Sequence, residues 1–480
     1  MKSRHGSLVL TGLVITVFLG HFSPAIAKVR KSTLGGNNGK SAIALDPQQQ
    51  PHVSYQSADY RLHHAWLSGR KWQNEVVDDT GDCGSWNSIA VDNLGRVHIS
   101  YHSERMNPYR QVLSHAVFDG VQWQITDVGD GGYSTSIALG TNGHAQILHY
   151  GNSGITLKFS KFDGNAWDTQ DTGLGGGLWF FPTALALDSD DTAHITYTAR
   201  GGEDSANYAR QDSGMWESEI LDSQVGGNLA TSLALDSLGR PHVAEAFQQT
   251  IRLRWFDGLQ WLSEDIFDEP DVPQYPDAVA LAFDEHDRPH ILFSTFFSVG
   301  GGGVNVTVYT YFDGVDWRGI LVDKKNAGFN VAVAVDGNRV VHGLYRLGRG
   351  NRSTLKYAQI TLPDVTGHWD LTDLIDGPES LRVDATLTVR NQGTDKSKSV
   401  PVAFYLSEDA VLDDGDTLLP LIRKTGGLKP DAEKVLSLEF QLQETALGKY
   451  LIAVIDPDKI LDDLDRPNNT IAIQLLPPIP

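Results

Sequence analysis

Two departures from a repeated pattern carry residue types suited to acid–base chemistry. The chain repeats a unit in which an apolar run precedes a segment that opens with histidine. The third residue after that histidine is aromatic in five units: Tyr55, Tyr101, Tyr197, Phe293 and Tyr345. The third unit has His149 there and the fifth has Glu245. Both groups are common general acids and bases. If the protein is an enzyme, they are its candidate catalytic pair, meeting across a central channel, and Tyr101 and His102 complete the candidate set.

The repeated histidine itself indicates structure rather than chemistry. It recurs in six of the seven units, as His52, His98, His194, His242, His290 and His342. A residue repeated in nearly every unit does the same job in each, so we expect it to hydrogen-bond a neighbouring turn. Cys83 is the only cysteine, which excludes an intramolecular disulfide. No Ser or His activator is evident beside it, and we interpret it as a partly buried thiol rather than a nucleophile.

Aromatic residues just before the apolar runs are the candidate ligand-binding residues. They are Trp86, Tyr133, Trp179, Phe180, Phe181, Tyr275 and Phe329. Rings at a channel mouth could stack on the apolar faces of sugars. The alternative is that they plug the mouth and pack between units. Arg346 and Arg349, followed by Arg352, could hold a ligand carboxylate, or belong to a solvated loop.

The elements that must position these residues are short strands. The apolar run recurs at 41–46, 88–92, 136–140, 183–188, 231–236, 279–284 and 331–336. A tryptophan follows it in six units at intervals of about 50 residues, as Trp72, Trp123, Trp167, Trp216, Trp261 and Trp317. Each unit reads as four strands, a to d, separated by Gly, Asp and Asn turns. Seven such units predict an all-β, seven-bladed β-propeller over 28–363.

The seventh unit has no tryptophan and no strand d, and the segment 28–34 resembles the end of a strand d. We therefore expect this N-terminal strand to close the ring. The a–b and c–d turns are short and uniform, so they share one face. The b–c and d–a loops vary from unit to unit and lie on the other face. Variable loops on a rigid scaffold usually carry binding, and the loop-rich face is the predicted site.

The start of the chain predicts export. Residues 1–27 combine a basic start, an apolar run and Ala25-Ile26-Ala27, which is typical of a Sec signal peptide. No later apolar stretch has the roughly 20 residues that a transmembrane helix needs. The net charge is −21, which argues against nucleic acid as a partner. We expect a secreted, extracellular or periplasmic protein, and a monomer.

The units resemble those of secreted bacterial seven-bladed propellers, which are loosely grouped with BNR/Asp-box-like propellers and propeller lectins. The likeness covers about 28–363 and rests on the SIALD, G-x-PHVSY, LxYAxFDG and Trp patterns. The Asp-box itself and the FG-GAP calcium loop are missing. Such propellers include lectins, lyases, glycosidases and scaffolds, so the resemblance implies a fold and leaves the function open.

Residues 364–480 predict a second domain, an Ig-like antiparallel β-sandwich. It resembles the CARDB family, a bacterial cell-adhesion-related domain. The match includes Asn391, Gly393, Phe404-Tyr405-Leu406-Ser407, Gly448, Tyr450, Asp456 and Asn468-Asn469. The carboxylates of Asp409, Asp413, Asp414 and Asp416 could bind calcium. The alternative, which the non-EF-hand spacing favours, is an acidic hairpin turn without metal.

Together these patterns predict an exported, non-enzymatic binding or adhesion protein without a required cofactor. Its expected ligand is a glycan or a surface protein, held at the loop-rich face. The first alternative is a carbohydrate-active enzyme, a polysaccharide lyase or glycosidase, on the same face. The second is a structural scaffold for an envelope assembly.

Overall fold

The computed structural model describes residues 27–106, 108–175, 182–201, 203–223, 230–247, 250–268, 274–299, 302–324, 327–348, 353–376 and 380–476. The predicted signal peptide lies outside these ranges, apart from Ala27. None of the helices within them has the length and apolar character needed to cross a bilayer.

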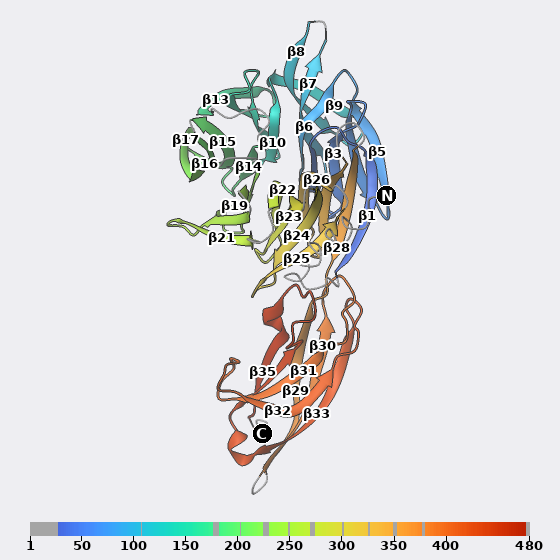
Figure 1. Cartoon of the computed structure of the whole chain (residues 1–480), viewed down its shortest axis with the longest axis vertical. Helices are drawn as coiled ribbons and strands as arrows, with labels where there is room; N and C mark the ends of the chain where they lie inside the picture. Colours follow the sequence, from blue (N-terminus) through green and yellow to red (C-terminus); the bar gives the residue numbers. More distant parts are fainter. Residues whose placement is uncertain are drawn as a thin grey trace, which may run out of the picture.

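The described part of residues 28–361 forms seven four-stranded antiparallel sheets, shown in the upper body of Figure 1. Blade 1 consists of β2 (Ser41–Leu45), β3 (Pro51–Gln56), β4 (Leu62–Ser68) and β5 (Lys71–Asp78). Blade 2 consists of β6 (Cys83–Val91), β7 (Val97–Arg105), β8 (Arg110–Phe118) and β9 (Trp123–Asp130). Blade 3 consists of β10 (Tyr133–Leu139), β11 (Ala145–Tyr150), β12 (Thr156–Phe162) and β13 (Trp167–Gly175). Blade 4 consists of β14 (Ala184–Leu187), β15 (Ala193–Gly201), β16 (Glu203–Asp212) and β17 (Met215–Ser223). Blade 5 consists of β18 (Ala230–Leu235), β19 (Pro241–Phe247), β20 (Thr250–Phe256) and β21 (Trp261–Asp268). Blade 6 consists of β22 (Gln274–Phe283), β23 (Pro289–Val299), β24 (Gly302–Phe312) and β25 (Trp317–Asp323).

Blade 7 combines both ends of this region. It consists of β26 (Ala327–Val335), β27 (Val341–Leu347), β28 (Thr354–Thr361) and β1 (Lys28–Gly36), and β1 pairs antiparallel with β28. The innermost strands contact one another in sequence from β2 through β6, β10, β14, β18 and β22 to β26, and β26 contacts β2. The sheets therefore form a closed ring, and the predicted all-β fold class with a seven-bladed propeller is confirmed.

Neighbouring blades pack through the repeated tryptophans at the starts of the d strands. The ring of Trp123 in blade 2 meets His64 of blade 1 edge-on at 5.3 Å, and Trp72 of blade 1 meets Tyr357 of blade 7 at 4.8 Å. Edge-to-face aromatic pairs of this kind each add about 1 kcal/mol beyond the area they bury. The repeat therefore supplies one inter-blade wedge in most units.

Three b–c hairpins extend further than the others on the loop-rich face. They belong to alternate blades and consist of β7 and β8, β15 and β16, and β23 and β24, with strands of 9 to 11 residues. The corresponding strands of blades 1, 3, 5 and 7 have 6 to 8 residues. Three long hairpins, in alternate blades, therefore project from the loop-rich face.

The C-terminal strands form two further sheets that face each other. Their strands are β29 (Val365–Asp376), β30 (Ser380–Asn391) and β33 (Glu433–Gln443) in one sheet, and β32 (Thr417–Lys424), β31 (Pro401–Ser407), β34 (Tyr450–Ile455) and β35 (Thr470–Gln474) in the other. Two short 3-10 helices, η2 (Glu444–Ala446) and η3 (Arg466–Asn469), connect strands. Side chains alternate between buried and exposed along β30 and β33. Trp369, Phe404 and Phe440 share the buried core, which confirms the predicted sandwich.

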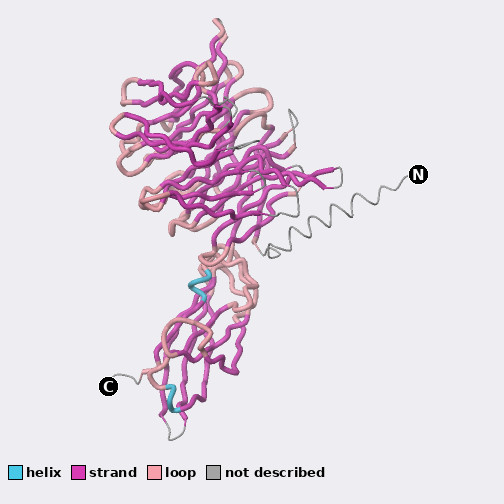
Figure 2. Tube along the Cα trace, turned by 60° about the vertical axis from the view of Figure 1, so that its left-hand side comes forward, coloured by secondary structure: helices cyan, strands magenta, loops and turns pink. Residues whose placement is uncertain are grey.

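The sandwich contacts the uniform turns of blades 6 and 7, and one of the short helices lies at this junction (Figure 2). Four ion pairs cross it: Arg466–Asp313 at 2.7 Å, Arg288–Asp465 at 2.7 Å, Arg339–Asp364 at 2.6 Å and Lys459–Asp316 at 2.9 Å. Leu464 also joins an apolar cluster of blades 6 and 7. These turns lie opposite the variable loops, so the sandwich leaves the loop-rich face uncovered.

Candidate functional site

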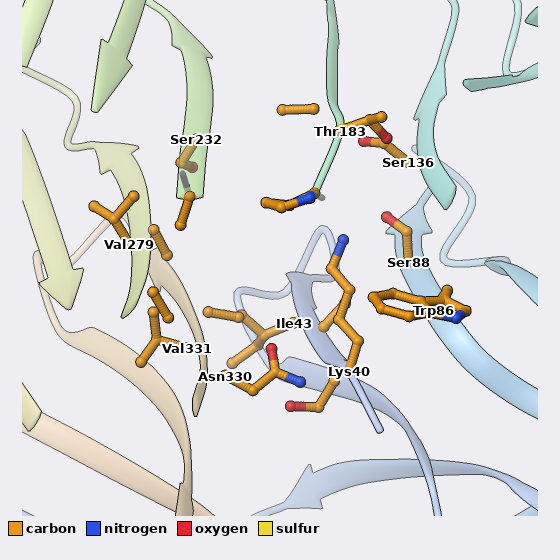
Figure 3. Close-up of a pocket in the computed structure, with 18 of the residues that line it drawn as sticks. Lys40, Ile43, Trp86, Ser88, Ser136, Thr183, Ser232, Val279, Asn330 and Val331 are labelled. Atoms are coloured by element: carbon orange, nitrogen blue, oxygen red, sulfur yellow. The ribbon is translucent and has the colours of Figure 1, made fainter. Parts of the chain in front are cut away.

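A cavity of about 710 Å³ lies at the loop-rich end of the central channel. Its walls are the first residues of the innermost strands of all seven blades, and Figure 3 shows them converging on one open space. Ile43, Leu233 and Val333 form part of an apolar wall. Polar side chains, including Lys40, Thr183 and Asn330, stand nearer the mouth. An apolar cavity with a few convergent polar groups is the usual form of a ligand site.

Hydrogen bonds between successive blades hold the backbone of the mouth in place. The Asn87 side chain donates to the Lys40 carbonyl at 2.6 Å, and the Thr135 hydroxyl donates to the Trp86 carbonyl at 2.7 Å. Across the closure of the ring, the Asn330 side chain donates to the Gly39 carbonyl at 2.9 Å. The backbones that carry Lys40, Trp86 and Asn330 are therefore preorganised, which lowers the cost of binding.

A second layer of bonds lies below the mouth. The hydroxyls of Ser88, Ser136 and Ser232 each accept a hydrogen bond from a backbone N–H of the following blade, at 3.3, 3.0 and 3.0 Å. These serines line the cavity (Figure 3). Their Oγ atoms are occupied by structural bonds, so we assign them to the scaffold rather than to nucleophilic chemistry.

Trp86 is the predicted aromatic residue that the structure places in the cavity wall. Its φ is 55°, a left-handed conformation that bulky residues rarely adopt. The pairing of β6 with β7 shifts register between Ser85 and Ser88, so the strand bulges where Trp86 sits. Bulges re-aim a side chain and often occur beside functional sites. Backbone strain retained at a cavity is consistent with a ligand-contacting role.

Lys40 projects its amine into the cavity beside the Trp86 ring (Figure 3). Its hydrogen-bond partner is the Thr135 carbonyl, 3.5 Å from Nζ, at the limit of a hydrogen bond. Burial lowers the pKa of Lys40 from 10.5 to about 8, because the charged form loses hydration. A weakly paired ammonium of this kind favours an incoming acceptor or anion.

The other charged residues of the described lining are Arg346 and Asp277. The Arg346 Nε donates to the Ser353 hydroxyl at 2.7 Å, and burial lowers the pKa of the guanidinium. Asp277 accepts a hydrogen bond from the Ser294 hydroxyl. Protein partners therefore hold both side chains more closely than the Thr135 carbonyl holds the amine of Lys40.

The four residues of the candidate catalytic set do not line this cavity. The His149 ring, fully buried, contacts the Ser160 hydroxyl at 3.3 Å. Glu245, also fully buried, accepts from the Arg254 Nε at 2.9 Å. Burial lowers the pKa of His149 to about 4 and raises that of Glu245. These two groups therefore face the interior of their own blades, and no contact between them is found among the described residues. A reaction shared by the two across the channel stays a hypothesis.

The other two members of that set lie at inter-blade contacts. The Tyr101 hydroxyl donates to Asp78 of blade 1 at 2.8 Å, and burial raises its pKa well above the ordinary value. The His102 ring contacts the Gly131 carbonyl at 2.6 Å and stacks on Tyr133 at 4.4 Å. Tyr133 is thus a packing partner of His102 in the structure.

The remaining candidates of the loop-rich face are only partly described. Trp179, Phe180, Phe181 and Arg349 lie outside the described residues, as does Arg352. Tyr275 pairs through its backbone with Phe296 in β22, and Phe329 lies in the stretch of β26 where its pairing with β27 shifts register. For these positions the sugar-stacking hypothesis stays a prediction.

The repeated histidines occupy matching hydrogen-bonded relays, which confirms their structural interpretation. In blade 7 the His342 ring lies 3.3 Å from Asp336 and 2.7 Å from the Tyr357 hydroxyl. The second oxygen of Asp336 accepts two backbone N–H groups of the a–b turn. Blade 4 repeats the relay, and in blades 1 and 2 a second histidine replaces the tyrosine. In blades 1, 4, 5 and 7 the histidine thus bonds the aspartate of its a–b turn, whereas in blades 2 and 6 the ring lies 3.8 and 3.6 Å from that aspartate, beyond hydrogen-bond distance.

Neither Cys83 nor the acidic hairpin presents a reactive or metal-binding cluster. Burial raises the pKa of the Cys83 thiol to about 12, so it is fully protonated at neutral pH. In the hairpin, Asp409 and Asp413 accept backbone N–H groups of Val411 and Gly415, and Asp416 accepts that of Asp413. No group of three or more His, Cys, Asp or Glu side chains in the described ranges is arranged to hold a metal. Calcium binding by these aspartates and Asp414 stays a hypothesis.

Sequence reasoning missed Lys40, Thr183, Asp277 and Asn330. The signal for Lys40 was present, because the residue six positions before the last residue of the apolar run is Trp86, Ser134, Pro182, Ala230, Ala278 or Asn330 in the other blades. Lys40 is the charged member of this set, and the position opens onto the channel. Lys40 was not among the candidates because these were aromatic residues of the same loops.

Comparisons with known proteins gave a family match for the C-terminal domain and several similar solved structures. A family model for CARDB matches residues 377–473. Similar solved structures include a triple arginine mutant of AofleA from Arthrobotrys oligospora, with 14% identity, 61% of this chain and 90% of that chain covered, and a TM-score of 0.44. The SapL1 lectin in complex with alpha methyl fucoside has 13% identity, 61% and 97% coverage, and a TM-score of 0.41.

The polysaccharide lyase Uly1 has 11% identity, 67% and 89% coverage, and a TM-score of 0.41. No curated protein matches the chain. What each of those proteins binds or cleaves is a property of that protein. The chain combines a propeller with a CARDB domain.

Proposed function

We propose that the protein is exported and binds a glycan, without cleaving it, at the mouth of the propeller channel. The observation that carries this proposal is the preorganised cavity in which the Trp86 ring and the Lys40 amine share one wall. A flat ring provides stacking area at low entropic cost. The amine and the Asn330 amide provide directional partners for hydroxyl or acidic groups.

Binding fits the cavity better than glycoside hydrolysis does. Most glycosidases need two carboxyl groups flanking the bond, about 5 to 10 Å apart. The described lining supplies one carboxylate, Asp277, which already accepts a hydrogen bond from Ser294. The buried carboxylate of Glu245 is engaged by Arg254 within blade 5. The described residues therefore offer no such pair at the mouth.

The test is binding of the purified protein to an array of polysaccharides and oligosaccharides, repeated with Trp86→Ala and Trp86→Phe. We expect a selective signal that Trp86→Ala lowers at least about tenfold, the usual loss for a buried aromatic anchor. Trp86→Phe should retain part of it. Tyr60→Ala is the matched control, since Tyr60 is also at positive φ but is exposed and outside the cavity lining.

A blank array with a cooperatively folded protein would overturn glycan binding for the sugars tested. A signal that Trp86→Ala leaves intact would place the ligand elsewhere. Co-purification of a protein partner, with insensitivity to Trp86, would favour the scaffold alternative.

A second function, eliminative cleavage of an acidic polysaccharide, is favoured by one observation. The pKa of Lys40, lowered to about 8 by burial, lies in the range of an effective general base. The neutral amine could remove the proton on the carbon next to a sugar carboxylate. The carbon–oxygen bond to the neighbouring sugar would then break, leaving a carbon–carbon double bond, and the departing oxygen would take a proton from water. Appearance of the unsaturated product, followed by its ultraviolet absorbance, would establish this function. Binding without product formation would leave the protein a lectin-like binder.

A further inference from the structure

We infer that the group seated at the channel mouth is an anion, the carboxylate or sulfate ester of an acidic polysaccharide, and that Lys40 is its counter-ion. The inference rests on the proposed glycan-binding function and narrows it to a ligand class. It follows from the surroundings of one ammonium group and from the charge of the cavity.

The Lys40 ammonium lacks a carboxylate partner within the described part of the chain. Its one hydrogen-bond acceptor is the Thr135 carbonyl at 3.5 Å. Most cations of the blades are paired more closely: Lys31 lies 3.0 Å from Asp323, and Arg252 lies 2.5 Å from Asp265. A partly buried cation normally finds an anionic partner. Here the partner position opens onto the cavity (Figure 3).

The charge of the cavity contrasts with that of the whole protein. The chain carries a net charge of −21. The described lining of the mouth has two cations, Lys40 and Arg346, and one carboxylate, Asp277. A positive site within an acidic protein directs anions to one place, because the remaining surface repels them. A neutral sugar would leave this partly buried ammonium with the Thr135 carbonyl at 3.5 Å as its hydrogen-bond acceptor and without a compensating negative charge.

The neighbouring ring indicates that the anion belongs to a sugar. Lys40 and Trp86 come from adjacent blades and line the same wall. The Lys40 carbonyl is held by the Asn87 side chain at 2.6 Å and the Trp86 carbonyl by the Thr135 hydroxyl at 2.7 Å, so both backbones are clamped. A sugar ring stacked on Trp86 would place an acidic substituent within reach of Lys40. A small inorganic anion would leave the indole unused.

The test uses paired probes that differ in charge. Polygalacturonate, hyaluronan and chondroitin sulfate are each compared with the methyl-esterified, carboxyl-reduced or desulfated form of the same polymer. We expect at least one acidic member to bind, with its uncharged counterpart weaker by roughly 10- to 100-fold, the range for losing a charge-assisted hydrogen bond. The carboxylate and sulfate pairs distinguish the two sources of charge.

Three variants assign the effect. Lys40→Met should remove the preference for the acidic member, so that the acidic and the neutral form of each polymer bind with similar, weak affinity. Lys40→Arg should retain part of the preference. Lys71→Met is the matched control, because Lys71 is exposed and lies outside the cavity.

The outcomes separate this inference from the proposed function. Equal binding of charged and neutral forms, lost in Trp86→Ala but not in Lys40→Met, would overturn the inference and leave glycan binding standing. Absence of binding to every polymer of the paired panel and of the wider array would overturn both. Loss of the acidic preference in Lys71→Met would also contradict it, since the effect would then be one of overall charge.

Discussion

The Arg466 Nε donates a hydrogen bond to the Asp313 carboxylate at 2.7 Å, and both side chains are almost fully buried. Arg466 belongs to η3 of the sandwich, and Asp313 begins the c–d turn of blade 6. A second arginine of that blade, Arg318, shares the same carboxylate oxygen at 2.7 Å. This bond fixes the sandwich to the face opposite the cavity, so the CARDB domain and the proposed ligand site lie at opposite ends of the channel.

Arg466→Met should destabilise the folded protein by about 3 kcal/mol, because it removes one partner of a buried ion pair. The free energy of unfolding, measured in urea, gives the value. The matched control is Arg390→Met, whose partner Asp431 is exposed, and a loss below about 1 kcal/mol is expected there. Equal effects of the two substitutions would contradict a rigid junction.

The repeat predicted the propeller because its signals are local. Alternating apolar residues and Gly-containing turns specify short strands, and the missing tryptophan of the seventh unit predicted a strand supplied from elsewhere. The pairing of Lys28–Gly36 with Thr354–Thr361 has that form. The contact of η3 with Asp313 had no such signal, because 153 residues separate the partners and neither stands out within its own domain.

His115→Tyr should make the protein less sensitive to acid. Burial, and then the nearby charge of His98, lower the pKa of His115 to about 3. The unfolded chain takes up this proton near pH 6.5, so between about pH 3 and 6.5 stability falls as the pH falls. Tyrosine at the matching position is known to fit, since Tyr208 and Tyr357 accept the same edge-on tryptophan contact.

The measurement is the free energy of unfolding at pH 7, 6 and 5. The free energy of unfolding of the variant should change less steeply with pH than that of the natural protein. The loss of one titrating proton corresponds to a difference of about 1.4 kcal/mol per pH unit. His368→Tyr, at an exposed histidine of the sandwich, should leave the slope unchanged. An unaltered slope in His115→Tyr would show that this histidine does not titrate as its burial predicts.

Lys40→Met should raise the melting temperature at pH 7. Because burial lowers the pKa of Lys40 to about 8, the unfolded chain holds more protons between about pH 8 and 10.5. The stability of the natural protein therefore rises with pH across that window. The free-energy cost of burying the charged ammonium is greatest below pH 8, where the group carries its proton in the folded state. Methionine removes the penalty. The advantage of the variant should shrink between pH 8 and 10.5, and a variant less stable at pH 7 would argue that the ammonium is not desolvated.

Glu245→Ala should destabilise the propeller by about 3 kcal/mol and leave glycan affinity unchanged. The substitution leaves Arg254 with Asp222 as its ion-pair partner and opens a gap in a fully buried position. Thermal unfolding and binding, measured on the same preparation, separate the two effects. Loss of turnover or of affinity in a variant that remains folded at the assay temperature would restore this residue to the functional site.

The site was less predictable than the fold, and the residues show why. His149 and Glu245 depart from the repeat, but the departures are compensated locally by Ser160 and Arg254. The sequence shows that these two residues differ from the repeat, but it does not show which neighbouring side chain satisfies each of them. Lys40 departs from the repeat at a position whose exposure to the channel becomes evident only after the ring closes.

The most direct measurement is a crystal structure of the protein with the tightest-binding acidic oligosaccharide. A sugar ring against Trp86, with its acidic group within 3.5 Å of the Lys40 Nζ, is the predicted result, the distance being the limit of a hydrogen bond. An ordered oligosaccharide on the sandwich, or on the outer surface between two blades with none at the channel mouth, would contradict the account.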